Sequence, residues 1–182
     1  HLPVFTGYVG KGMLDACAVG SVFASPSVDQ IASAIRNGNN GRGVLCILGN
    51  YGGDVMNFEM ACEIVKSEGI ETKMIIVSDD IASASNEDKL KRRGIAGLIF
   101  AFKIAGASSE DGATLEQVYD LTLKANNNLR TIGVAVSSCI LPEVGKPTFE
   151  LEKDEIEIGM GIHGEPGTVS YTHLRAHETL DN

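Results

Sequence analysis

The sequence predicts an α/β protein with a mostly parallel, doubly wound sheet and helices on both faces. Strand-like and helix-like segments alternate along the chain, a pattern that favours parallel strands joined by crossover helices. The run GVLCILGN (43–50) is continuously apolar over the length of a strand, as expected for a parallel strand buried on both faces. The chain also contains 21 glycines, which suggests many tight turns between these elements.

The elements of this sheet can be placed along the chain from their start and stop signals. In chain order they are strand 21–26, helix 27–38, strand 43–50, helix 54–69, strand 72–80, polar loop 81–94, buried helix 95–107, amphipathic helix 114–128, and strands 131–139 and 155–162. The first helix opens with a capping box of Ser27 and Gln30 and closes on Gly38. Gly69 ends the second helix in the same way.

Length and charge narrow the class of protein. A chain of 182 residues is long enough for one domain that buries roughly 70% of its unfolded surface. The net charge is −9, which disfavours nucleic acid and anionic membranes as partners because both need a basic face. The basic run KLKRR (89–93) is interpreted as a solvated face.

The compartment is expected to be the cytoplasm. No apolar run reaches the roughly 18 residues of a membrane span, and no signal peptide is recognisable. None of the four cysteines forms a C-x-x-C pair, and Cys17, Cys46 and Cys62 lie in apolar surroundings, so we expect buried free thiols. The chain starts at His1 without a Met, so we expect further sequence before it.

The last fifteen residues, TVSYTHLRAHETLDN (168–182), differ in style from the rest. They are polar and show no strand–helix continuation, so we predict a domain over 1–167, truncated at both ends, followed by an adapter-derived scar at 168–182. His173 and His177 are spaced i, i+4 and could share a helix face as metal ligands. Without a third ligand at suitable spacing, we expect no metal.

The turn GNYGGD (49–54) is the first candidate site, because it joins an apolar strand to a helix. In an open α/β sheet, ligands bind beyond the carboxyl ends of the strands. Gly49 and Gly53 are candidate binding residues, since glycines let the backbone approach a small molecule closely. Asp54 has two interpretations: a group that acts on the bound molecule, or a carboxylate that caps the helix.

The stretch GMGIHGEPG (159–167) is the second candidate site. Its first six residues fit G-x-G-x-x-G, but a dinucleotide site also needs a following helix, which Glu165-Pro166-Gly167 interrupts, so we interpret the match as accidental. No Walker A phosphate loop occurs either, since VGKPT (144–148) has Pro where a hydroxyl residue is needed. His163 lies between glycines and is either a nucleophilic imidazole or a structural histidine.

Six stretches form a set that runs in order from His1 to Gly167: GYVGKGMLD, VFASPSVDQI, GNYGGDVMNFEMA, RRGIAG, KIAGA and GKPTFEL…EIEIGMGIHGEPG. Together they resemble the substrate-binding K subunit or domain of dihydroxyacetone kinases. The resemblance implies that His163, in the HGEPG loop, bonds to the ketone carbon of the substrate as a hemiaminal. It further implies that Asp54, which ends the N-Y-x-G-D motif, and His1 handle the proton of the hydroxyl that is phosphorylated.

Two departures from the family pattern bear on the substrate. The family commonly reads G-H-E-P where this chain has His1-Leu2-Pro3, and it places a lysine contacting substrate where this chain has Gly49. A glycine leaves more room than a bulky cation, which makes a larger ketose such as the four-carbon erythrulose plausible beside dihydroxyacetone.

The resemblance also implies partners. The phosphate donor, ATP with Mg²⁺ or a phosphotransferase-linked protein, would sit on a separate L-type domain or subunit, and this chain would bind no cofactor and form a homodimer. Two other functions are kept as alternatives: a non-catalytic, ketose-binding co-regulator of transcription and a nucleotide-binding oxidoreductase. A pure sensor needs His163 but neither Asp54 nor His1, so their presence favours the kinase.

Overall fold

A computed structural model describes residues 4–138, 140, 145–147, 149–152, 155–162, 165, 167 and 169–172. Its elements, in chain order, are η1 (Thr6–Tyr8), α1 (Val28–Gly38), β1 (Val44–Gly49), α2 (Gly52–Ser67), β2 (Thr72–Val77), η2 (Lys89–Lys91), α3 (Gly97–Glu110), α4 (Leu115–Asn128), β3 (Val134–Ala135), β4 (Glu155–Ile158) and β5 (Val169–Thr172). None of the helices in these ranges is long and apolar enough to cross a membrane.

The centre of the fold is a parallel pair of strands, β1 and β2. Their register runs from Val44 opposite Thr72 to Gly49 opposite Val77, so both strands end at the same edge. Thr131 continues this layer through a parallel bridge to Asp80, just beyond the end of β2. The apolar runs of the sequence therefore form the parallel strands that their pattern predicts.

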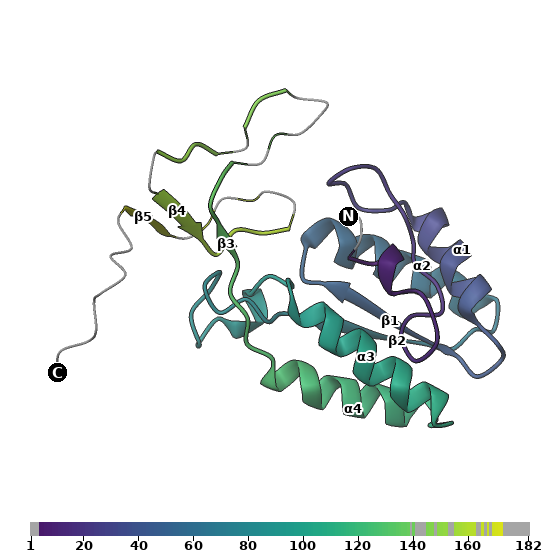
Figure 1. The fold of residues 1–182 in the computed structure, drawn as a ribbon. Coiled ribbons are helices and arrows are strands. Elements are labelled where there is room, and N and C mark those ends of the chain that lie inside the picture. Colours follow the sequence, from purple (N-terminus) through teal and green to yellow (C-terminus); the bar gives the residue numbers. More distant parts are fainter. Residues whose placement is uncertain are drawn as a thin grey trace.

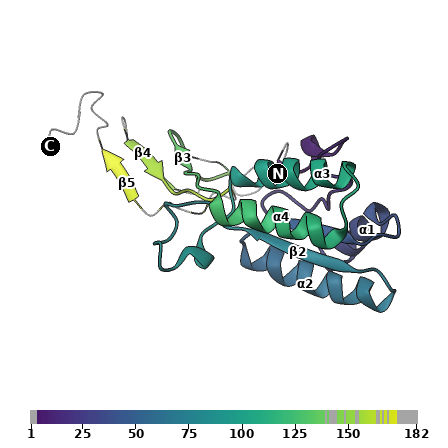
Figure 2. The same ribbon diagram turned by 90° about the horizontal axis from the view of Figure 1, so that it is seen from below.

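Helices cover both faces of the parallel pair (Figure 1; Figure 2). One core cluster joins α1 and α2 to β1 through Ile31, Ile35 and Val65, all buried. The other joins α3 to β2, with Phe102 fully buried between them and Tyr119 of α4 packed against the cluster. The predicted α/β class, with helices on both faces of a parallel sheet, is confirmed.

Side-chain capping opens α1 and α4 but not α2 or α3. The capping box of Ser27 and Gln30 is present at α1, and a second box, of Thr114 and Gln117, opens α4. At α2, in contrast, the N-cap is Tyr51 and no side chain caps the helix. Asp54 thus lies inside the first turn of α2 rather than at its N-cap.

The N-terminal stretch 21–26 is not a strand, contrary to the prediction. It turns back on itself, with the Ala24 N–H donating to the Ser21 carbonyl at 3.2 Å, and Phe23 adopts a left-handed φ of 53°. That conformation ends any extended run, because a non-glycine residue with positive φ cannot continue a strand.

The structure also contains a second, antiparallel sheet that the sequence did not predict. In it β4 pairs with both β3 and β5, and the ribbon shows it beside the parallel layer (Figure 1). Strand β5, Val169–Thr172, lies within the segment 168–182, for which the sequence predicted no strand. Those four residues therefore pair with the sheet, while the proposed scar and the boundary after Gly167 stay predictions.

The described cysteines are free, as predicted, but only Cys46 is fully buried. Cys17 and Cys62 are half-buried. Cys139 lies outside the described residues, as do His173 and His177.

Candidate functional site

The candidate site lies where β1 and β2 end. The turn after β1 carries Asn50 and Tyr51, and the chain after β2 carries Asp79 and Asp80. Because the two strands are parallel and in register, these residues meet at one edge of the sheet, which is where open α/β folds bind ligands.

Asn50 holds the loop after β2 against this edge. Its amide nitrogen Nδ2 donates to the carbonyls of Leu90 and Arg92, each at 2.8 Å. Its backbone N–H donates to the Val77 carbonyl at 3.0 Å. Asn50 therefore fixes the polar loop 81–94 relative to the end of β1, which keeps Arg93 beside the site.

Two buried aspartates follow β2, and their carboxylate oxygens differ in the hydrogen bonds that they accept. Asp79 accepts hydrogen bonds from the backbone N–H groups of Ile95 at 2.9 Å and Gly97 at 2.8 Å, and from the Thr131 hydroxyl. Asp80 accepts from the Ala82 N–H at 3.0 Å, but its Oδ2 has no hydrogen-bond partner in the described part of the chain. Burial raises the pKa of Asp80 above its usual value.

Tyr51 connects the turn after β1 to the region of the second candidate stretch. Its hydroxyl oxygen accepts a hydrogen bond from the Ile162 backbone N–H at 3.2 Å. Burial is the main cause that raises the pKa of Tyr51 above its usual value, so the hydroxyl stays protonated at neutral pH. Ile162 is the residue immediately before His163 in the sequence.

Backbone contacts also hold the ends of that stretch. The Arg93 guanidinium donates through Nη1 to the Gly159 carbonyl at 2.6 Å. The Gly161 N–H donates to the Glu165 carbonyl at 3.1 Å, which joins the residues on either side of position 163. A Cβ on Gly161 would meet the end of the Glu165 side chain, which would have to shift.

The predicted site residues are placed only in part. Gly49 is the last residue of β1, and Gly53 and Asp54 lie in the first turn of α2. Gly49 is buried, Gly53 is exposed, and Asp54 is half-buried. His163 and His1 lie outside the described residues, so their predicted roles remain predictions.

Gly49 is enclosed by its own turn. A Cβ at this position would lie 2.9 Å from Cε2 of Tyr51, 3.1 Å from Cδ2 of the same ring and 3.3 Å from the Gly94 carbonyl oxygen. The Tyr51 ring therefore occupies the space into which a side chain at position 49 would start. At Gly53, a Cβ would lie 2.8 Å from the Ser25 hydroxyl.

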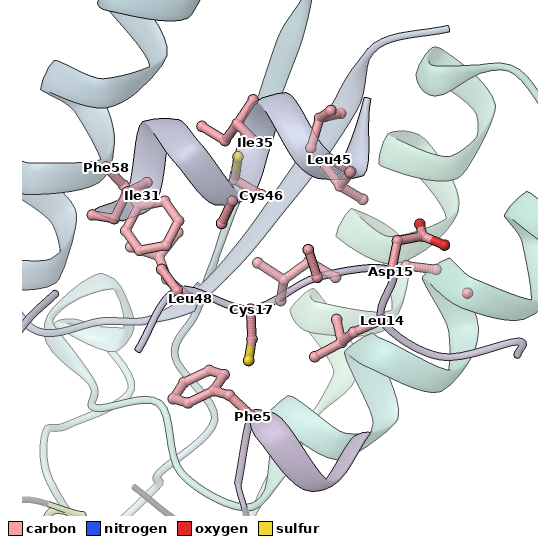
Figure 3. A pocket seen from close by; sticks show the side chains of 18 of the residues that line it. Phe5, Leu14, Asp15, Cys17, Ile31, Ile35, Leu45, Cys46, Leu48 and Phe58 are labelled. Carbon is pink, nitrogen blue, oxygen red and sulfur yellow. The ribbon is translucent and has the colours of Figure 1, made fainter. Parts of the chain in front are cut away.

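A cavity of about 280 Å³ lies beside β1, and Figure 3 shows side chains of Leu45, Cys46 and Leu48 in its lining. Its lining is mixed. Phe5, Cys17, Ile31, Leu48 and Phe58 are among the apolar residues that line it, and Asp15, Asn40, Arg42 and Asp54 are among the polar ones. A small polyhydroxylated molecule needs hydrogen-bond partners over most of its surface. The part of the cavity lined by Asp54 and the other polar side chains therefore suits a small polar ligand better than the part lined by apolar side chains.

The sequence interpretation included Asn50 and Tyr51 only as part of the turn 49–54, and it did not single out Asp79, Asp80 or Arg93. One signal was available: Asp79 and Asp80 directly follow a predicted parallel strand, where ligand-binding residues gather. The contact between Tyr51 and Ile162 spans 111 residues and leaves no local signal in the sequence.

Comparisons with known proteins agree with the six-stretch resemblance. A family model described as the Dak1 domain matches residues 1–182. The chain is 50% identical over 167 residues to the PTS-dependent dihydroxyacetone kinase 1, dihydroxyacetone-binding subunit DhaK, of Listeria innocua, covering 92% of this chain and 51% of that protein. It is 46% identical to the L-erythrulose 1-kinase of Mycolicibacterium smegmatis, covering 92% of this chain and 29% of that protein. The chain thus spans about half the length of the first relative and less of the second.

Solved structures give the same picture. The native dihydroxyacetone kinase of C. freundii superposes with a TM-score of 0.88 at 42% identity, covering 96% of this chain and 32% of that one. A dihydroxyacetone kinase operon co-activator, Dha-DhaQ, superposes with a TM-score of 0.86 at 35% identity, covering 94% and 53%. Both an enzyme and a regulator therefore share this fold.

Proposed function

Because this chain belongs to the Dak1 domain family, we propose that it is the ketose-binding part of a phosphotransferase. Its substrate is a short-chain ketose, dihydroxyacetone or erythrulose. These two ketoses appear in the names of its relatives. The observation that carries the proposal is the hydrogen bond from Ile162 to Tyr51. It ties the residue before His163 to the turn that leads into Asp54.

In the first proposed step, a ring nitrogen of neutral His163 attacks the ketone carbon. A C–N bond forms while the carbonyl π pair moves to oxygen, which gains a proton as the other ring nitrogen loses one. The product is a hemiaminal that holds a small, flexible substrate in one orientation. A polyol such as glycerol is excluded because it has no carbonyl carbon for the imidazole to attack.

In the second proposed step, the terminal hydroxyl of the bound ketose attacks the phosphoryl group. An O–P bond forms as the bond between phosphorus and its donor breaks, and Asp54 with His1 takes the hydroxyl proton. The donor, ATP with Mg²⁺ or a phosphotransferase-linked protein, is held by a separate L-type domain or subunit. Catalysis by this chain then rests on positioning and proton transfer.

Intact-mass measurement of the full-length protein with dihydroxyacetone or erythrulose tests this proposal. We expect a covalent adduct under gentle ionisation that the His163→Ala variant lacks. An adduct that persists unchanged in that variant contradicts the assignment.

The competing co-regulator function predicts a different result for the same full-length protein. The similarity to an operon co-activator is the observation behind it. An adduct on His163 without phosphoryl transfer, in the presence of an L-type partner and either donor, would favour the co-regulator. Turnover under those conditions supports the kinase. The proposed homodimer is checked by sedimentation of the same full-length protein.

A further inference from the structure

We propose that Tyr51 is a positioning residue that holds the backbone next to His163, and that the glycine at position 49 is what lets its ring do so. This inference rests on the proposed function, because it concerns how the ketose-binding loop is placed. Tyr51 touches the protein rather than the substrate in this assignment.

The ring of Tyr51 lies against the end of β1 because Gly49 has no side chain. A Cβ on Gly49 would approach ring atom Cε2 to 2.9 Å, closer than real Cβ atoms come to a neighbour. The Gly94 carbonyl oxygen lies 3.3 Å from the same Cβ position and also limits the space there. The backbone itself cannot move away, since Gly49 pairs with Val77 in the parallel sheet. Any side chain at position 49 must therefore displace the tyrosine ring.

From this place the hydroxyl of Tyr51 reaches Ile162. The hydroxyl oxygen of Tyr51 accepts a hydrogen bond of 3.2 Å from the Ile162 backbone N–H. Because the donor is a backbone group, this bond fixes the main chain one residue before His163 whatever the side chain of Ile162 does. The neighbouring contacts, Arg93 to Gly159 at 2.6 Å and Gly161 to Glu165 at 3.1 Å, hold other points of the same stretch. Tyr51 is the member of this set that comes from the turn leading into Asp54.

The consequence for binding follows from geometry. Addition of an imidazole to a ketone requires the reacting atoms to be held close and aligned, and a misplacement of about 1 Å can cost roughly 100-fold. Loss of the hydroxyl leaves the Ile162 N–H without this acceptor and loosens one anchor of the loop. Hemiaminal formation should weaken, while the Asp54 carboxylate stays in the first turn of α2.

The test compares Tyr51→Phe, which removes only the hydroxyl, with Tyr119→Phe. Tyr119, in α4, is a matched control because its ring lies under the ammonium group of Lys73 in β2, away from the loop. A phenylalanine ring preserves that contact. In the full-length protein with its donor partner, we expect Tyr51→Phe to raise the ketose KM about five- to 100-fold with kcat within roughly threefold. Tyr119→Phe should change neither.

This split separates positioning from loss of folded protein. A variant that merely unfolds more easily loses active enzyme, which lowers kcat and leaves KM unchanged. An unchanged KM in Tyr51→Phe overturns the inference, whatever happens to kcat.

Gly49→Ala provides an independent approach to the same contact. Its Cβ displaces the ring, so it should raise KM as Tyr51→Phe does. In the double variant the two effects should not add, because the hydroxyl bond is already lost in either single variant. Full additivity of the two KM effects overturns the link between Gly49 and Tyr51.

Amide hydrogen exchange tests the positioning role of Tyr51 separately from the proposed ketose-binding function. Peptides covering 156–165 should exchange faster in Tyr51→Phe than in wild type, even if no ketose binds. Absence of an adduct in the wild type sinks the proposed function, and equal exchange in the two proteins sinks the positioning role of Tyr51.

Discussion

Asp79 and Gly97 fit each other at the start of α3. The Gly97 N–H donates to Asp79 Oδ2 at 2.8 Å, and a Cβ on Gly97 would lie 2.5 Å from the Asp79 carboxyl carbon. The carboxylate can bind the first turn of α3 only because residue 97 has no side chain. This pair ties α3 to the end of β2, where the candidate site begins.

Gly97→Ala should therefore destabilise the protein. The added methyl group must push aside a buried, hydrogen-bonded carboxylate, and overpacking of this kind costs about 1–3 kcal/mol. Gly52→Ala is the matched control, since Gly52 begins α2 as Gly97 begins α3 and has open space around its Cβ position. Urea unfolding measures both free energies. Equal stability of the two variants would mean that the start of α3 can shift freely.

Asp79→Ala should cost more than Gly97→Ala. The substitution leaves the N–H groups of Ile95 and Gly97 without their acceptor, and each buried unpaired donor costs about 1–3 kcal/mol. We expect a loss of about 2–5 kcal/mol in the free energy of unfolding. A loss below about 1 kcal/mol would indicate that water replaces the carboxylate.

Among Cys17, Cys46 and Cys62, the cysteines that the structure describes, Cys62 should be the thiol that reacts most readily near neutral pH. The hydrogen bond from the Cys46 thiol lowers the pKa of Cys62 to about 7, whereas burial raises the pKa of Cys17. Since the thiolate is the reactive form, alkylation of Cys62 by iodoacetamide should rise through a midpoint near pH 7. Peptide mapping across a pH series gives the midpoint for each cysteine.

Cys46→Ala is the control for that assignment. It removes the donor, so the midpoint for Cys62 should move up toward the usual thiol value of about 8.5. An unchanged midpoint would show that the contact between the two thiols does not set the reactivity of Cys62.

The parts of the fold that could be predicted from the sequence are those with local signals. The capping box of Ser27 and Gln30 and the apolar run of β1 each depend on a few neighbouring residues. The strand expected at 21–26 failed because Phe23 adopts a positive φ, which no local pattern indicates for a phenylalanine. The bond between Tyr51 and Ile162 depends on the whole fold and could not be read from either segment alone.

Asp54→Asn should keep ketose binding but lose turnover. An amide preserves the shape of the carboxylate but cannot accept the hydroxyl proton. We expect the rate of phosphorylation to fall roughly 100-fold or more at similar ketose affinity. Asp54 is not at the N-cap of α2, so the loss should not come with an unfolded helix, which circular dichroism checks. Turnover within a few-fold of wild type would remove Asp54 from the proton-transfer step.

The size of the ketose should depend on position 49. If the absence of a lysine at this position leaves room at the site, the full-length kinase should prefer a four-carbon ketose over dihydroxyacetone, by about 10–200-fold for a matched pocket. Gly49→Lys should return the preference toward three carbons, either by its own bulk or through the Tyr51 ring, which a Cβ at position 49 would meet at 2.9 Å. Gly49→Ala separates these routes, because it displaces the ring without adding a long cation. A shift in the ratio of kcat/KM for the two ketoses in Gly49→Lys alone assigns the effect to the lysine side chain, and a shift in both variants assigns it to the ring. Identical ratios in wild type and both variants would show that position 49 does not set substrate size.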